Sequence, residues 1–114
     1  MTKAELDSLS ELIRNPERNH RHRVLVIGHC AMERENKALY VTADDRKKGQ
    51  TENAVWLEVP IDDATWKLNG KTVLVEGVFS MEDRGHLQLY AGGLVDVSLL
   101  EEWSGDLNKE KSGR

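Results

Sequence analysis

Five short runs of apolar, largely β-branched residues follow one another along this chain, and their order limits the folds open to it. Alternation and β-branched content predict that each run is a strand. The runs are residues 23–28, 38–42, 54–59 and 71–79, and a fifth that spans 86–90 and continues after Gly92-Gly93 to Val97. Between the third and fourth runs, Asp62 or Asp63 suits a helix N-cap and Gly70 a left-handed helix end, which predicts one or two helical turns.

Glycines inside the predicted strands indicate how the sheet bends. Residues 23–28 and 72–77 share the pattern x-Val-Leu-Val-x-Gly. We interpret them as equivalent neighbouring strands rather than a domain duplication, because the flanking segments differ. An interior glycine marks a sharp bend or a bulge, and Gly92-Gly93 also interrupts the alternation of the last strand. Such kinks allow a five-stranded sheet to curl into a closed barrel.

The predicted fold class is therefore mainly β. Five strands with a short helix between strands 3 and 4 follow the order of the Greek-key barrel of the oligonucleotide/oligosaccharide-binding (OB) fold, here with an additional N-terminal helix. A small barrel of another type, such as an SH3-like one, is the nearest rival. The helix-length insertion before Lys71 favours the OB order.

The segments on either side of the predicted barrel are expected to differ from it. Residues 1–18 are predicted to hold a helix packed on the barrel, with Thr2 and Glu5 as a capping box and Asn15-Pro16 as its end. The apolar face of this helix would consist of Leu6, Leu9, Leu12 and Ile13. The barrel would span residues 19–103, and the polar residues 104–114 are predicted to form a disordered tail.

Composition and charge exclude several classes of protein. A chain of 114 residues, 39% of them hydrophobic, is enough for one small globular domain. Its formal net charge of −4 argues against a generic nucleic-acid coat protein, which is usually strongly basic. The single cysteine, Cys30, cannot form an internal disulfide, and no apolar run approaches the length of a membrane span. The polar opening lacks the apolar core of a signal peptide, so we expect a cytoplasmic location unless a leader has been removed.

Six stretches of the chain also carry a family resemblance through their order and spacing. They are residues 12–17, 23–28, 38–41, 52–57, 68–77 and 85–90, within a span of about residues 9–103. Together they resemble a family of small, largely uncharacterised bacterial OB-fold proteins. The resemblance implies the fold, and it brings no activity or catalytic residue with it. The chain departs from the family at residues 19–22, where an acidic, glycine-containing turn would be expected.

Two aromatic side chains are candidates for ligand binding. If Val55 and Leu57 face the core, alternation places Trp56 on the opposite face, and Tyr40 is likewise out of phase with its neighbours. Strands 2 and 3 form the usual binding face of an OB barrel, where a base stacked on an aromatic ring gains about 1–3 kcal/mol. The alternative, which we favour, is that Trp56 points inward or is covered by a loop or by the N-terminal helix.

Five cations in two loops would flank the same face and supply phosphate contacts. They are Arg34 and Lys37 in the first loop, and Arg46, Lys47 and Lys48 in the second. Acidic residues interleave with them and cancel most of their field. We therefore favour an ordinary solvated loop surface over a phosphate-binding patch.

The remaining aromatic, histidine and cysteine residues are given structural roles. Trp66 and Trp103 are expected to plug the barrel end and to pin the C-terminus. His29 and Cys30 point to opposite faces of a strand, so they do not ligate one ion together, and no metal site is predicted. The alternating residues His86, Gln88 and Tyr90 would form a polar patch on one strand face.

The sequence contains no motif that indicates catalysis. A glycine-rich phosphate loop and a Gly-x-Ser-x-Gly elbow are both lacking, and the aspartate pairs at residues 44–45 and 62–63 suit turns and helix caps. We therefore expect a non-catalytic binding module without a cofactor. Its partner is expected to be another protein, contacted as a subunit or as an inhibitor or immunity-type protein, and the acidic balance narrowly favours this. Single-stranded nucleic acid, bound through Tyr40, Trp56 and the loop cations, is the alternative.

Overall fold

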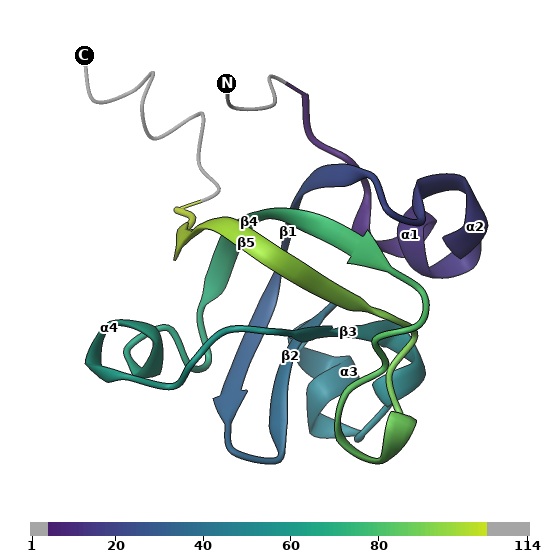
Figure 1. Cartoon of the computed structure of the whole chain (residues 1–114). Helices are drawn as coiled ribbons and strands as arrows, with labels where there is room; N and C mark the ends of the chain where they lie inside the picture. Colours follow the sequence, from purple (N-terminus) through teal and green to yellow (C-terminus); the bar gives the residue numbers. More distant parts are fainter. Residues whose placement is uncertain (1–4, 105–114) are drawn as a thin grey trace.

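Five strands form one mixed sheet in the computed structural model, which describes residues 5–104 (Figure 1). The strands are β1 (Arg23–Glu33), β2 (Asn36–Tyr40), β3 (Ala54–Leu57), β4 (Thr72–Ser80) and β5 (Gly93–Glu102). Hydrogen bonds join them in the order β1-β2-β3-β5-β4, and β4 pairs back with β1, so the pairing runs in a ring. The β3–β5 pair is parallel and the other pairs are antiparallel. The predicted mainly β class with five strands is confirmed.

Short helices lie before the first strand and between later strands. They are α1 (Leu9–Arg14), α2 (Pro16–Asn19), α3 (Ala43–Lys47) and α4 (Asp63–Trp66), with the 3-10 turns η1 (Thr51–Asn53) and η2 (His86–Gln88). The predicted helix between strands 3 and 4 is confirmed as α4. Asp62 is its N-cap and forms a capping box with Thr65, and Gly70 follows with a φ of +84°. In Figure 1, α4 lies on the other side of the molecule from α1 and α2.

The N-terminal helix begins later than predicted. Its cap is Ser8, whose hydroxyl accepts a hydrogen bond from the backbone N–H of Glu11, whereas Leu6 lies before the helix and is exposed. The predicted cap Thr2 lies outside the described residues. Asn15-Pro16 does end α1, but Pro16 also starts α2, because proline is tolerated at the first position of a helix.

The fifth predicted strand is wrong over residues 86–90. The backbone there turns through left-handed conformations, with φ of 69° at Gly85, 56° at Leu87 and 60° at Gln88. A strand requires extended backbone, so β5 begins only at Gly93. The predicted polar patch of His86, Gln88 and Tyr90 on one strand face is therefore wrong as well.

Two further segments differ from the sequence prediction. The chain between strands 2 and 3 was expected to be a loop, but it holds α3, whose cap is the Thr42 hydroxyl. Trp66 does not plug an end of the sheet, since its side chain is 55% exposed. Trp103 is half-buried, and its backbone N–H donates to the carbonyl of Thr72. Of the predicted tail, residues 105–114 lie outside the described part of the chain.

The apolar core lies inside the ring of strands and under α1. Its buried members are Leu9, Leu12, Val24, Val26, Cys30, Met32, Leu39, Val55, Leu57, Val73, Val75, Phe79 and Leu94. The two x-Val-Leu-Val-x-Gly strands are neighbours, as predicted, and Val26 of β1 lies opposite Val75 of β4. Gly77 sits at a register shift between β4 and β5, which confirms the expected bulge. A Cβ at Gly28 would lie 2.9 Å from Leu9 Cδ2, so this glycine lets α1 approach β1 closely.

Candidate functional site

A second apolar cluster occupies the outer face of β1, β2 and β3, where the sequence predicted a ligand platform. Three buried alanines, Ala31, Ala38 and Ala54, leave room on this face for the rings of Tyr40 and Tyr90. Alternation predicted the direction of Trp56 correctly, because Val55 and Leu57 belong to the inner core whereas Trp56 packs against the outer cluster. However, Tyr40 is buried and cannot stack on a ligand. The predicted Tyr40–Trp56 platform is therefore not available in this structure.

Tyr90 is the side chain that covers the face, and it comes from the segment of residues 81–92 between β4 and β5. The Asn36 Oδ1 atom accepts hydrogen bonds from the hydroxyls of Tyr40 at 2.7 Å and of Tyr90 at 2.8 Å. Burial raises the pKa of Tyr90 to about 12, and burial also raises the pKa of Tyr40. Both phenols are therefore protonated donors at neutral pH, and the bond from Tyr90 to Asn36 attaches the 81–92 segment to β2.

Trp56 is half-buried among groups of its own chain. Its ring centroid lies 5.4 Å from that of Tyr90, at an interplanar angle of 57°. Lys37 Nζ lies over the ring at 5.3 Å from the centroid, and the indole N–H donates to Glu58 Oε1 at 3.0 Å. Gly85 also touches the ring, since a Cβ there would lie 2.4 Å from Trp56 Cδ2. Of the alternatives that the sequence left open for Trp56, the inward direction is wrong, and the arrangement fits the one in which a loop covers the ring.

Arg46, one of the five predicted cations, is turned into the protein instead of toward a ligand. Its side chain is 19% exposed and forms an ion pair with Glu33 at 3.3 Å. Its Nη2 donates to Asn69 Oδ1 at 2.9 Å, and its Nη1 donates to the carbonyl of Cys30 at 3.3 Å. The same Nη1 lies 3.2 Å from His29 Nε2. These contacts join α3 to β1 and to the turn that follows α4.

The other predicted cations are not gathered on one face. Lys37 lies over Trp56 and donates to the carbonyl of Val59, while Lys48 forms an ion pair with Asp44 at 3.0 Å. Arg34 is exposed in the turn between β1 and β2. Lys47 borders a hollow of about 420 Å³ beside His29 and Arg46. The five cations therefore lie in different surroundings: Arg46 and Lys37 contact groups of their own chain, whereas Arg34, Lys47 and Lys48 are exposed.

His29 and Cys30 lie on opposite faces of β1, as expected. Cys30 belongs to the inner core, and burial raises the pKa of its thiol to about 11. Burial lowers the pKa of His29, and the charge of Arg46 lowers it further. Within residues 5–104, no group of three or more His, Cys, Asp and Glu side chains is placed to hold a metal ion.

Two exposed apolar features were missed by the sequence interpretation. Leu87, at the tip of the 81–92 segment, is 73% exposed, and Leu89 beside it is exposed as well. Trp66 of α4 borders a hollow of about 770 Å³ together with Lys67 and Lys71. Gly85 and Gly92, which bracket the leucines, were the available signal that this segment is a loop and not a strand.

Neither a scan of protein-family models nor a search of curated proteins finds a match to this chain. The family resemblance of the six stretches therefore stays a prediction. Across the described residues, no helix combines the length and the apolar character needed to cross a membrane.

Proposed function

We propose that the ring of five strands is an OB-type barrel and that the protein is a non-catalytic module that binds another protein. Three features support the barrel: the strand order β1-β2-β3-β5-β4, the parallel pairing of β3 with β5, and the position of α4 between β3 and β4. The face that such barrels commonly use for a ligand is filled by Tyr90. Binding is therefore assigned to another part of the surface.

The exposed tip of the 81–92 segment is the observation that carries this proposal. Leu87 exposes most of its side chain while its backbone holds a left-handed φ of 56°, a conformation that costs an ordinary residue of order 1–3 kcal/mol. The base of the segment is rigidly tied, because the backbone N–H of Tyr90 donates to the carbonyl of Arg84 and Arg84 Nε donates to the carbonyl of Tyr90. A strained apolar tip on a fixed base is preorganised for contact with a partner.

Photo-crosslinking in the source cells tests this assignment. A photo-reactive amino acid introduced at position 87 is expected to give one defined protein adduct, whereas the same group at the exposed control position Glu52 of η1 should give none. An adduct of twice the mass of the chain would identify the partner as a second copy. The same adduct pattern at both positions, or no adduct at position 87, would contradict the proposal.

The partner identified in this way allows a quantitative test. Binding of the purified partner is expected to weaken at least about tenfold in Leu87→Ser, which corresponds to about 1.4 kcal/mol or more. Glu52→Ser serves as the matched control and should bind like the wild type. Unchanged affinity in Leu87→Ser would show that the tip is not the contact surface.

Single-stranded nucleic acid remains a second candidate, and Trp66 is the observation that favours it. This indole is more than half exposed beside Lys67 and Lys71, so a base and its phosphate could be held there together. Fluorescence titration with mixed oligonucleotides at low salt should then show quenching that Trp66→Phe abolishes and Trp56→Phe retains. Absence of quenching would remove this candidate and leave the protein contact unaffected.

A further inference from the structure

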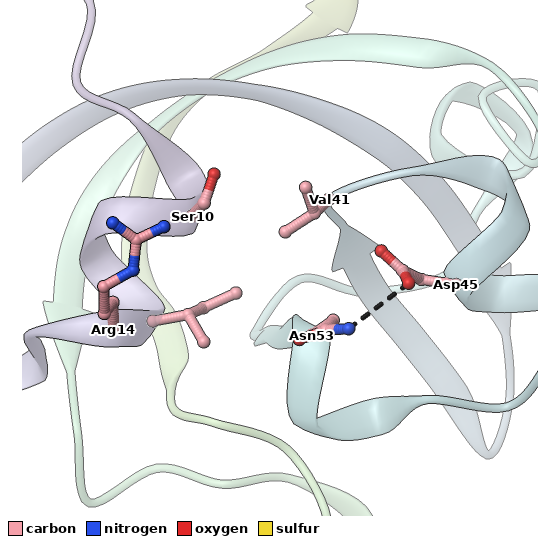
Figure 2. A pocket seen from close by; sticks show the side chains of 6 residues that line it. Ser10, Arg14, Val41, Asp45 and Asn53 are labelled. Carbon is pink, nitrogen blue, oxygen red and sulfur yellow. Dashed lines mark hydrogen bonds between the residues drawn. The ribbon is translucent and has the colours of Figure 1, made fainter.

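A hollow of about 350 Å³ lies between α1 and the chain that follows β2 (Figure 2). Its lining consists of Ser10, Ile13, Arg14, Val41, Asp45 and Asn53. In Figure 2, Ser10 and Arg14 stand on one side, on α1, and Val41, Asp45 and Asn53 stand on the other. The two walls come from segments about thirty positions apart in the chain, so the hollow exists only in the folded protein.

Each wall of the hollow also carries an apolar side chain. Ile13 and Val41 are half-buried, and both pack against the inner core. Their inner sides are held by that packing, while their outer sides face the hollow. A ligand with a small aliphatic group would remove this apolar surface from water.

The rim carries opposite charges on opposite walls. Arg14 is largely exposed, and its ion pair with Glu11 is long, at 3.6 Å. Asp45 uses Oδ1 to accept a hydrogen bond from Asn53 Nδ2 at 3.2 Å, which leaves lone pairs on its carboxylate for a further donor. Within residues 5–104, no ion pair joins Arg14 to Asp45.

We propose that this hollow binds a free α-amino acid with an aliphatic side chain. The α-carboxylate pairs with the Arg14 guanidinium, the α-ammonium pairs with the Asp45 carboxylate, and the side chain lies on Ile13 and Val41. A simple anion would be repelled by Asp45 and a simple cation by Arg14, so a zwitterion is the ligand that satisfies both walls. The volume falls within the range of small-molecule sites.

The first experiment uses the unaltered protein and three ligands of similar shape. L-leucine, 4-methylpentanoate, which lacks the ammonium group, and 3-methylbutylamine, which lacks the carboxylate, are titrated into ¹⁵N-labelled protein. Leucine should shift the backbone amide signals of Ser10, Val41 and Asn53 in a saturable way, and each analogue should bind at least about tenfold more weakly. Equal binding of all three, or no saturable shift with leucine up to about 10 mM, would overturn the proposal.

A second experiment removes one charge at a time and measures how the preference among the three ligands changes. Asp45→Asn should weaken leucine binding and abolish the preference for leucine over 4-methylpentanoate, because the repulsion of a simple anion is gone. Arg14→Gln should do the same for 3-methylbutylamine. Arg18→Gln changes an exposed arginine of α2 outside the hollow and should leave leucine binding unchanged. Unaltered selectivity in both charge variants would show that the hollow does not recognise the ammonium and carboxylate groups of the ligand.

Discussion

Arg46 shows how one side chain can hold a short helix in place. Its guanidinium connects α3 to Glu33, to the carbonyl of Cys30 and to Asn69, whose Oδ1 also accepts the backbone N–H of Met32. A hydrogen bond that involves a charged group contributes about 1.5–3 kcal/mol, and partial exposure reduces this contribution. The Arg46 side chain therefore links α3 to β1 and to the turn that follows α4.

Removal of this guanidinium should destabilise the protein measurably. Arg46→Met keeps much of the aliphatic stem but loses the bonds to Asn69 and Cys30, so the free energy of unfolding should fall by about 2 kcal/mol. Lys48→Met removes an exposed cation of the same region and should change it by less than about 0.5 kcal/mol. Urea denaturation of both variants measures the difference. Equal changes in the free energy of unfolding in the two variants would mean that the Arg46 contacts add no more stability than an exposed ion pair does.

The lowered pKa of His29 predicts that the stability of the protein depends on pH. Burial, with the Arg46 charge as the second cause, holds the pKa of His29 below its ordinary value of 6.5. As the pH falls below 6.5, the unfolded chain takes up this proton before the folded protein does. The stabilisation that depends on a neutral His29 is therefore present above pH 6.5 and is lost as the pH falls toward the folded-state pKa.

The variant His29→Gln separates this contribution from that of the carboxylates. The free energy of unfolding is measured by urea denaturation at about pH 7.5 and about pH 5.5, on either side of the histidine value. The wild type should lose more stability between the two pH values than His29→Gln does. An identical loss in both proteins would contradict the assignment.

At the scale of elements, the segment of residues 81–92 closes the outer face of β1, β2 and β3. Tyr90→Ala should leave a cavity over the three alanines and destabilise the protein by about 3–5 kcal/mol, whereas Tyr90→Phe loses one hydrogen bond and about 0.5–1.5 kcal/mol. The alanine variant should also expose Trp56, which acrylamide quenching of tryptophan fluorescence detects. Leu87→Ala, at the exposed tip, should alter neither quantity. Quenching in Tyr90→Ala that matches the wild type would show that the segment does not depend on this ring.

These elements differ in how far the sequence predicts them. The caps of α4 are local, since Asp62 and Thr65 stand three residues apart, and this helix was predicted. The cap of α3 is equally local, with Thr42 three residues before Asp45, and it was overlooked. The turn at residues 86–90 was mistaken for a strand because Leu87 and Leu89 alternate with polar residues. Its left-handed backbone depends on contacts with β2 and β3, and these leave no periodic pattern in the sequence.

The parts of the candidate site likewise differ in how far the sequence predicts them. Alternation along β3 was enough to place Trp56 on the outer face. The ring that covers this face, Tyr90, lies 34 positions further along the chain, and its contact with Asn36 is a property of the folded molecule. The hollow at α1 likewise needs two distant segments. Sequence patterns therefore predicted directions of side chains here, and they did not predict which segments meet.

At the scale of the whole molecule, the parallel β3–β5 pair completes the ring. Two register pairs, Trp56 with Gly93 and Leu57 with Leu94, form this junction, and the backbone N–H of Trp56 donates to the carbonyl of Gly92 at 2.8 Å. Close packing leaves no room for a side chain there, since a Cβ at Gly93 would lie 2.3 Å from the backbone oxygen of Asp83. Gly93 is therefore required where the segment of residues 81–92 packs against this junction, and not merely by the bend of β5.

The β1–β4 pair contributes fully buried side chains to the core, which makes Val75 a demanding position to test. Val75 is fully buried and lies opposite Val26, which is also fully buried. Val75→Asp would place a carboxylate among apolar side chains, at a cost of several kcal/mol against a total stability of about 5–15 kcal/mol for an ordinary domain. We expect that this variant does not fold, as shown by the loss of dispersion in its amide NMR spectrum. Thr72→Asp introduces the same group at an exposed position of the same strand and should fold normally. A Val75→Asp protein with the melting temperature of the wild type would mean that β4 does not face the core as described.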